Sequence, residues 1–163
     1  WGYMLENGAT TLWERWELST GCGMNSHNHP MMGSVGSWFY KVLAGINLTP
    51  GTVGFDRFEI RPVFAAGLDH VTAKHRTVRG LVESAWRREG RGIALTVEIP
   101  VNSEAEVTIP VGPGQGIWEG GACIWQPGGA VQAGAGIHLI GPGAAGVTFR
   151  VGSGRYEFVV RQA

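Results

Sequence analysis

Apolar and polar residues alternate in short runs through the last two thirds of the chain. A period of two places successive side chains on a dry and a wet face, as in the strands of an antiparallel β-sandwich. The alternating apolar positions are Phe58 and Ile60; Ile93, Leu95, Val97 and Ile99; Val107, Ile109 and Val111; Val147, Phe149 and Val151; Tyr156, Phe158 and Val160. The pattern predicts that the chain from about Phe55 onward folds as such a sandwich.

Glycine-rich segments separate several of these runs. Glycine recurs every few residues from 112 to 146, and we interpret Gly112-Pro113-Gly114-Gln115-Gly116 and Gly141-Pro142-Gly143 as turns between short strands. The segment 89–92, Glu-Gly-Arg-Gly, lies between two apolar runs and predicts a hairpin turn.

A different period precedes the β-rich part. Residues 34–46 carry apolar side chains at a spacing of three and four, the pattern of a helix with one buried face. Pro30 lies near the expected helix start, and Gly45 followed by Pro50-Gly51 marks its end. The apolar positions are Val35, Trp38, Phe39, Val42, Leu43 and Ile46.

The change of period predicts two domains. We place the boundary within residues 49–54, so that residues 1–51 form a helical segment and residues 52–163 form the β-sandwich. The predicted fold class is therefore mainly β, an antiparallel sandwich preceded by a short helical segment.

Composition and charge limit the kinds of molecule that we expect the chain to bind. Apolar residues make up 44% of the 163 residues and charged residues 16%, which is enough apolar surface for a folded core. Because 13 basic and 13 acidic side chains balance, no field draws in nucleic acid or an anionic membrane, and a neutral ligand fits better. Cys22 and Cys123 are too few for a disulfide framework.

The candidate chemistry begins in residues 8–17, where Trp13 and Trp16 flank Glu14 and Glu17 follows. A flat indole can stack on the apolar face of a pyranose while carboxylates bond its hydroxyls or activate water. The alternative is that both tryptophans, three apart on a helix, are core residues with the glutamates on the wet side.

A histidine-rich segment follows, with His27 and His29 on either side of Asn28 and Cys22 shortly before. The spacing matches no standard zinc pattern, and we favour polar residues that bond one another in a loop entering a helix. We expect no metal and no cofactor. The His-Asn-His string resembles a nuclease motif, which the neutral charge argues against.

The ordered motifs resemble one enzyme family. G-A-T-T-x-W-E-R-W at residue 8, M-N-S-x-N-H at residue 24 and G-x-V-G-x-W-x-Y at residue 33 are similar to those of inverting bacterial α-L-rhamnosidases, built on a six-hairpin α/α barrel. Residues 55–62 resemble the first strand of that family's C-terminal β-sandwich. The resemblance implies that residues 1–51 are the end of the barrel.

The resemblance also implies functional residues. The family's general base falls on Glu14, with Glu17 as the next candidate; a histidine that faces the sugar falls on His29, and Trp13 helps to wall the pocket. The general acid lies upstream of these motifs in the family. Since the chain opens at Trp1 without a methionine, we expect a piece of a longer enzyme that hydrolyses terminal α-L-rhamnosides.

Two other functions stay open. The chain could be a non-catalytic β-sandwich module that binds carbohydrate or stabilises its parent, or it could have a hydrolase activity of its own through Glu14, His27 or His29. The apolar helical face could also pair with a second copy, forming a homo-oligomer.

Overall fold

The computed structural model of the protein describes residues 1–21, 26–128 and 134–163. The chain divides into two compact units, Trp1–Phe39 and Tyr40–Ala163. In the described part of the chain, no helix is both long enough and apolar enough to cross a membrane.

The first unit contains short helices joined by loops. Its elements are α1 (Gly2–Glu6), the 3₁₀ turn η1 (Pro30–Ser34) and α2 (Val35–Trp38), after which the chain continues as the π-helical turn η2 (Phe39–Leu43). Pro30 occupies the first position of η1, where its missing N–H costs no hydrogen bond. Helical geometry is present in most of the predicted range 34–46. The prediction is wrong for its last residues, because the helix ends at Leu43 and Ile46 begins a strand.

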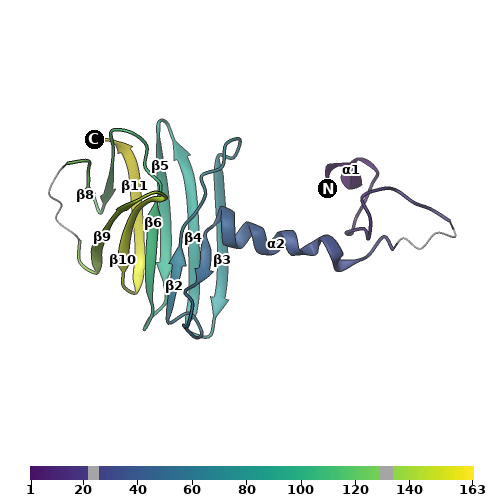
Figure 1. Ribbon diagram of the computed structural model, residues 1–163, viewed down its shortest axis with the longest axis horizontal. Coiled ribbons are helices and arrows are strands. Elements are labelled where there is room, and N and C mark those ends of the chain that lie inside the picture. The colour runs from purple at the N-terminus through teal and green to yellow at the C-terminus, as the bar shows by residue number, and fades with distance from the viewer. Residues whose placement is uncertain (22–25, 129–133) are drawn as a thin grey trace. The chain divides into compact units, whose positions relative to one another are not determined.

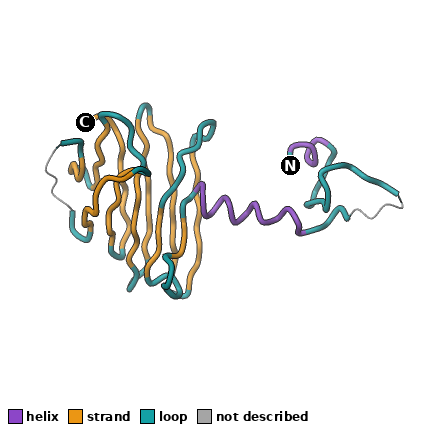
Figure 2. The backbone as a smooth tube through the Cα atoms, in the orientation of Figure 1, coloured by secondary structure: helices purple, strands orange, loops and turns teal. Residues whose placement is uncertain are grey.

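The second unit is a sandwich of two sheets, which confirms the predicted mainly β fold class (Figures 1 and 2). The five-stranded sheet has the order β1 (Ile46–Leu48), β2 (Arg57–Ile60), β6 (Glu104–Ile109), β10 (Gly146–Val151) and β9 (Ile137–Gly143). The six-stranded sheet has the order β3 (His70–Thr77), β4 (Gly80–Glu89), β5 (Gly92–Ile99), β11 (Gly154–Gln162), β7 (Gln115–Glu119) and β8 (Ala122–Trp125). Neighbours pair antiparallel except β2 and β6, which run parallel.

The alternating apolar residues form the core between the sheets. Phe58 and Ile60 of one sheet and Leu95 and Val97 of the other are at most 1% exposed and belong to one buried cluster. The predicted hairpin at residues 89–92 is confirmed, because Glu89 pairs with Gly92 across a two-residue turn. A period of two thus identified most of the buried face of the sandwich.

Two local predictions in the β part are wrong. Gly141-Pro142-Gly143 is not a turn but the end of β9, where Pro142 pairs with Val147. A proline fits there because β9 is an edge strand. On its outer side no strand follows, so no backbone N–H is needed there to bond a neighbour. Residues 55–62, which resemble the first strand of the family's sandwich, contain the second strand, β2. The strand β1 precedes β2 in the chain and pairs with it.

The end of the helix is fixed to the sandwich through its backbone carbonyls. The last C=O groups of a helix have no partner within it and must be satisfied elsewhere. Here each carbonyl from residue 41 to residue 45 accepts a hydrogen bond from a donor in the same unit. The donors are Asn47 Nδ2 to Lys41 (2.9 Å), Val63 N to Val42 (3.1 Å), Trp86 Nε1 to Leu43 (2.9 Å), Ser84 Oγ to Ala44 (2.6 Å) and Arg61 N to Gly45 (2.9 Å).

Gly45 makes this junction possible. Its backbone has a φ of 76°, a left-handed conformation that favours glycine at the end of a helix. A Cβ at this position would overlap the backbone of Arg61 and Pro62. The chain can therefore leave the helix and enter β1 within two residues.

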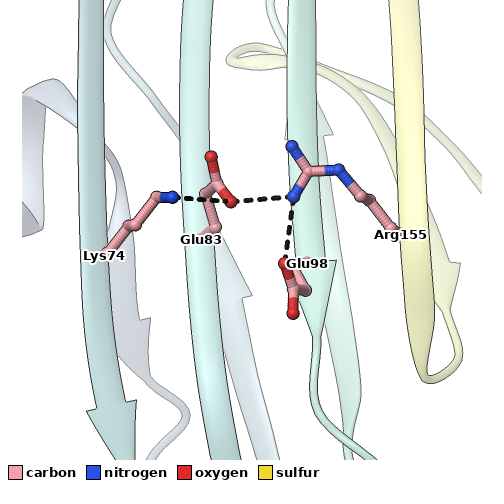
Figure 3. Close-up of polar contacts among 4 residues, drawn as sticks. All are labelled: Lys74, Glu83, Glu98 and Arg155. Carbon is pink, nitrogen blue, oxygen red and sulfur yellow. Dashed lines mark hydrogen bonds and ion pairs between the residues drawn. The ribbon is translucent and has the colours of Figure 1, made fainter.

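A row of charged side chains crosses four strands of the six-stranded sheet (Figure 3). Lys74, Glu83, Glu98 and Arg155 occupy opposed positions on β3, β4, β5 and β11. Arg155 Nη1 lies 2.8 Å from Glu83 Oε2 and 2.9 Å from Glu98 Oε2, and Lys74 Nζ lies 3.6 Å from Glu83 Oε2. The arginine thus separates two carboxylates that would otherwise repel each other across the strands.

We predict that Gly45→Ala destabilises the protein strongly. The free energy of unfolding should fall by roughly 2–4 kcal/mol, because a side chain in left-handed backbone costs about 1–3 kcal/mol and the overlap with Arg61 adds to it. Chemical denaturation of the two proteins measures the change. Gly51→Ala is the matched control, because Gly51 has a φ of 79° and open space around it. An equal loss in both variants would show that the close approach does not matter.

The charged row predicts an acid-sensitive contribution to stability. The hydrogen bond from Arg155 lowers the pKa of Glu83 below its usual value of 4.5, and the charges of Arg155 and Lys74 act in the same direction. Because the folded pKa is depressed, the contribution is present above about pH 4.5 and is lost as the pH falls through the folded pKa.

Glu83→Gln should therefore lower the melting temperature near neutral pH by a few degrees, at roughly 2–4 °C per kcal/mol lost, and by less in acid. The measurement is thermal unfolding across a pH series. Glu106→Gln, at an exposed position of β6, is the control. A Glu83→Gln variant that loses equal stability at every pH would contradict the electrostatic account.

Candidate functional site

The tryptophan-glutamate segment is not helical. Residues 7–20 form turns, bends and extended loop, seen as loop in Figure 2. Leu12 O accepts a hydrogen bond from His29 N (2.8 Å), and Glu14 N donates to Ser26 O (2.8 Å). The helical version of the core interpretation is therefore wrong, since these backbone groups pair with a second segment instead of a helical turn.

The two tryptophans have different surroundings. Trp13 is 3% exposed, and its ring stacks on His27 at 4.9 Å between centroids and meets Tyr3 edge-on at 6.4 Å. Trp16 is 50% exposed and contacts the ring of Trp1 edge-on at 5.1 Å. Of the two tryptophans, only Trp13 is buried.

Glu14 is held by two hydrogen bonds to Ser26, one to its side chain and one from its backbone. Its side chain is half-buried, and its Oε2 accepts a hydrogen bond from the backbone N–H of Ser26 at 2.9 Å. Because Ser26 O accepts the N–H of Glu14, the two residues bond reciprocally. The pairing fixes one carboxylate oxygen, Oε2.

His29 enters the same arrangement from the start of η1. Its Nδ1 accepts a hydrogen bond from Met31 N at 3.1 Å, as a helix N-cap does. With Nδ1 acting as acceptor, a neutral ring carries its proton on Nε2. His29 therefore presents an N–H donor on the side of the ring away from the helix.

Glu17, the second carboxylate of the motif, lies apart from this pairing. Arg15 Nη1 is 3.8 Å from Glu17 Oε1, and both side chains are more than half exposed. Solvent screens an exposed pair of this kind. Glu14 and Glu17 thus differ in burial and in the groups named here, and the choice between them as the base stays a prediction.

Two ring nitrogens of the histidine segment are bonded to backbone groups. Cys22 lies outside the described residues, as do Met24 and Asn25 of the asparagine-histidine motif. His27 donates from Nε2 to Ser19 O at 3.1 Å, and Nδ1 of His29 is occupied by Met31 N. Among residues 1–21, 26–128 and 134–163, no group of three or more potential ligands is placed to hold a metal.

An apolar hollow of about 620 Å³ lies in the first unit. It is lined by Trp1, Trp16, Met31, Met32, Ser34, Val35, Trp38 and Phe39. Trp38 and Phe39 of the predicted apolar face are 48% and 49% exposed, whereas Leu43 and Ile46 are buried in the second unit. The exposed part of the predicted face therefore ends where the helix meets the sandwich, and its pairing with a second copy stays a prediction.

Two family profiles match successive parts of the chain. Residues 1–43 match the bacterial alpha-L-rhamnosidase 6 hairpin glycosidase domain, and residues 45–122 match the bacterial alpha-L-rhamnosidase C-terminal domain. Both profiles describe domains of one glycoside hydrolase family. The chain belongs to the bacterial α-L-rhamnosidase family.

Individual relatives agree with this assignment. An α-L-rhamnosidase of Streptomyces avermitilis is 39% identical over 116 residues, 68% of this chain and 11% of the relative. The solved α-L-rhamnosidase from Dictyoglumus thermophilum matches 99% of this chain with a TM-score of 0.83 and 37% identity, and the chain covers 17% of it. The Streptomyces avermitilis enzyme solved in complex with L-rhamnose has a TM-score of 0.76 at 32% identity, over 99% of this chain and 15% of that one.

We predict that metal removal leaves the activity of the whole enzyme unchanged. Since nitrogens of His27 and His29 are engaged by backbone groups and their spacing fits no zinc pattern, chelator treatment should change turnover by less than about twofold. The measurement is hydrolysis of an aryl α-L-rhamnoside before and after dialysis against chelator, with elemental analysis of both samples. Stoichiometric zinc that leaves together with the activity would overturn this.

Proposed function

We propose that this chain is the C-terminal part of an α-L-rhamnosidase that hydrolyses terminal α-L-rhamnosides with inversion, and that Glu14 is its general base. The observation that carries the proposal is the reciprocal hydrogen bonding of Glu14 and Ser26. It holds a half-buried carboxylate in place at the position that corresponds to the family's base.

The chemistry follows from that fixed carboxylate. Glu14 Oε1 accepts a proton from a water molecule as the water attacks the anomeric carbon. A second carboxylic acid, outside this chain, protonates the leaving oxygen on the opposite face of the ring. Inversion requires the two carboxyl groups to stand roughly 6.5–9.5 Å apart, so that the water fits between the base and the sugar.

His29 and Trp13 have supporting roles in the proposal. The Nε2–H of His29 can donate to a sugar hydroxyl, because Met31 N already occupies Nδ1. We place Trp13 within the wall of the pocket, behind the surface that meets the sugar, because its ring is packed between His27 and Tyr3.

For the sandwich we propose a structural role. Its side chains Ser84, Trp86 and Asn47 donate hydrogen bonds to backbone carbonyls at the end of the helix, where the chain leaves the glycosidase part. The other open role, carbohydrate binding, has weaker support. Trp118 has one ring contact with the Arg161 guanidinium at 4.5 Å, which occupies a surface that a sugar would need. The division into domains at residues 1–51 and 52–163 stays a proposal, with β1 lying before that boundary.

Glu14→Gln in the whole enzyme should lower kcat by at least about 10²–10⁴-fold, because glutamine keeps the shape but cannot accept the proton. The measurement is steady-state hydrolysis of an aryl α-L-rhamnoside, with thermal unfolding to confirm that the variant folds.

Glu17→Gln is the matched control and should retain most of the activity, since Glu17 lies in an exposed pair with Arg15. An impaired Glu17→Gln beside an active Glu14→Gln would exchange the two assignments. The isolated chain should not hydrolyse the substrate above background; robust cleavage by it would favour the third hypothesis, an activity of its own.

A further inference from the structure

His27 connects three segments of the first unit. Its ring stacks on Trp13 with 4.9 Å between centroids and 26° between planes. Its Nε2 donates to Ser19 O at 3.1 Å, and its own carbonyl accepts a hydrogen bond from the Thr11 hydroxyl. The side chain and backbone of one residue thus hold together the segment before Glu14, the loop after it and the segment that pairs with it.

The contacts of His27 lie beside the contacts of Glu14. Trp13 directly precedes Glu14 in the chain, and Ser26 directly precedes His27. The stack of Trp13 on His27 is therefore the neighbour of the reciprocal bonds between Glu14 and Ser26. A shift of either ring would move the backbone that carries the carboxylate or the N–H that holds it.

The stack of Trp13 on His27 is confined by further contacts, so it can fix the position of the backbone on either side of it. Trp13 is 3% exposed and is confined on another side by the edge-on ring of Tyr3. The contact between two flat rings holds each in a defined orientation relative to the other. The imidazole is further held by its bond to the Ser19 carbonyl, so the ring cannot turn without breaking it.

We propose that His27 is a positioning residue for Glu14: it fixes the carboxylate through the Trp13 stack and through the backbone of Ser26. The inference rests on the proposed role of Glu14 as the base. His27 does not itself exchange a proton with the substrate. Its contribution is geometric, and a misplacement of about 1 Å in a reacting group can cost as much as 10²-fold in rate.

Three variants of the whole enzyme separate the contacts of His27. His27→Phe keeps a ring for the stack and loses the bond to Ser19; His27→Gln keeps a polar group and loses the stack; His27→Ala loses both. His138→Ala, at an exposed position of β9, is the control. The measurements are kcat and KM for an aryl α-L-rhamnoside, near-ultraviolet circular dichroism for the packing of Trp13, and thermal unfolding.

We expect kcat of His27→Ala to fall by about 10- to 100-fold with KM changed less than about threefold, because the carboxylate is displaced while the sugar contacts persist. His27→Phe should recover most of kcat and the near-ultraviolet signal, whereas His27→Gln should not. The control should match the unmodified enzyme.

Other outcomes overturn the inference. A rise in KM with unchanged kcat would make His27 a sugar contact, and full activity of His27→Ala and His27→Gln would show that it has no role. If His27→Ala does not fold, the comparison of the Phe and Gln variants decides. An active Glu14→Gln overturns the proposed base and this inference together, whereas an inactive Glu14→Gln beside unaltered His27 variants overturns only the inference.

Discussion

The structure depends on satisfying the backbone where a helix ends against a β-sandwich. Carbonyls at a helix C-terminus have no internal partner, and leaving such groups buried without one costs about 1–3 kcal/mol each. The sandwich provides side-chain donors from Ser84, Trp86 and Asn47 and backbone donors from Arg61 and Val63. Gly45 supplies the left-handed turn that lets the chain proceed from the helix into β1. Residues 41–45 and the strands that follow are in this way joined by hydrogen bonds within the second unit.

Backbone hydrogen bonds also order the candidate site, although it has no regular secondary structure. Residues 11–14 and 26–29 pair through two backbone hydrogen bonds, Glu14 N to Ser26 O and His29 N to Leu12 O, and Ser26 N also donates to the Glu14 carboxylate. The surrounding rings of Trp13, His27 and Tyr3 limit how far the segments can slide. A carboxylate that has to receive a proton at one position gains from such support, because no reorganisation is then needed during the reaction.

Much of the fold could be predicted from the sequence because burial imposes a period on strands. Phe58, Ile60, Leu95 and Val97 lie in the core as their alternation indicates. The pattern could not show that Pro142 belongs to an edge strand, or that β2 and β6 run parallel, since both depend on distant neighbours. In the proposed site, the motifs indicate Glu14 and His29, whereas the role proposed for His27 rests on a ring contact between residues 14 positions apart. Spacing alone suggested a helix for Trp13 and Trp16, and pairing with residues 26–29 overrides it.

The central claim is that Glu14 is the base of an inverting reaction, and a crystal structure of the whole enzyme with bound rhamnose tests it most directly. The quantity to measure is the separation between the Glu14 carboxyl group and the carboxyl group nearest the glycosidic oxygen. The account predicts roughly 6.5–9.5 Å, with Glu14 Oε1 in reach of a water below the anomeric carbon. A separation of about 5–5.5 Å, which is typical of retaining enzymes, or a Glu14 side chain that faces away from the sugar, would contradict it.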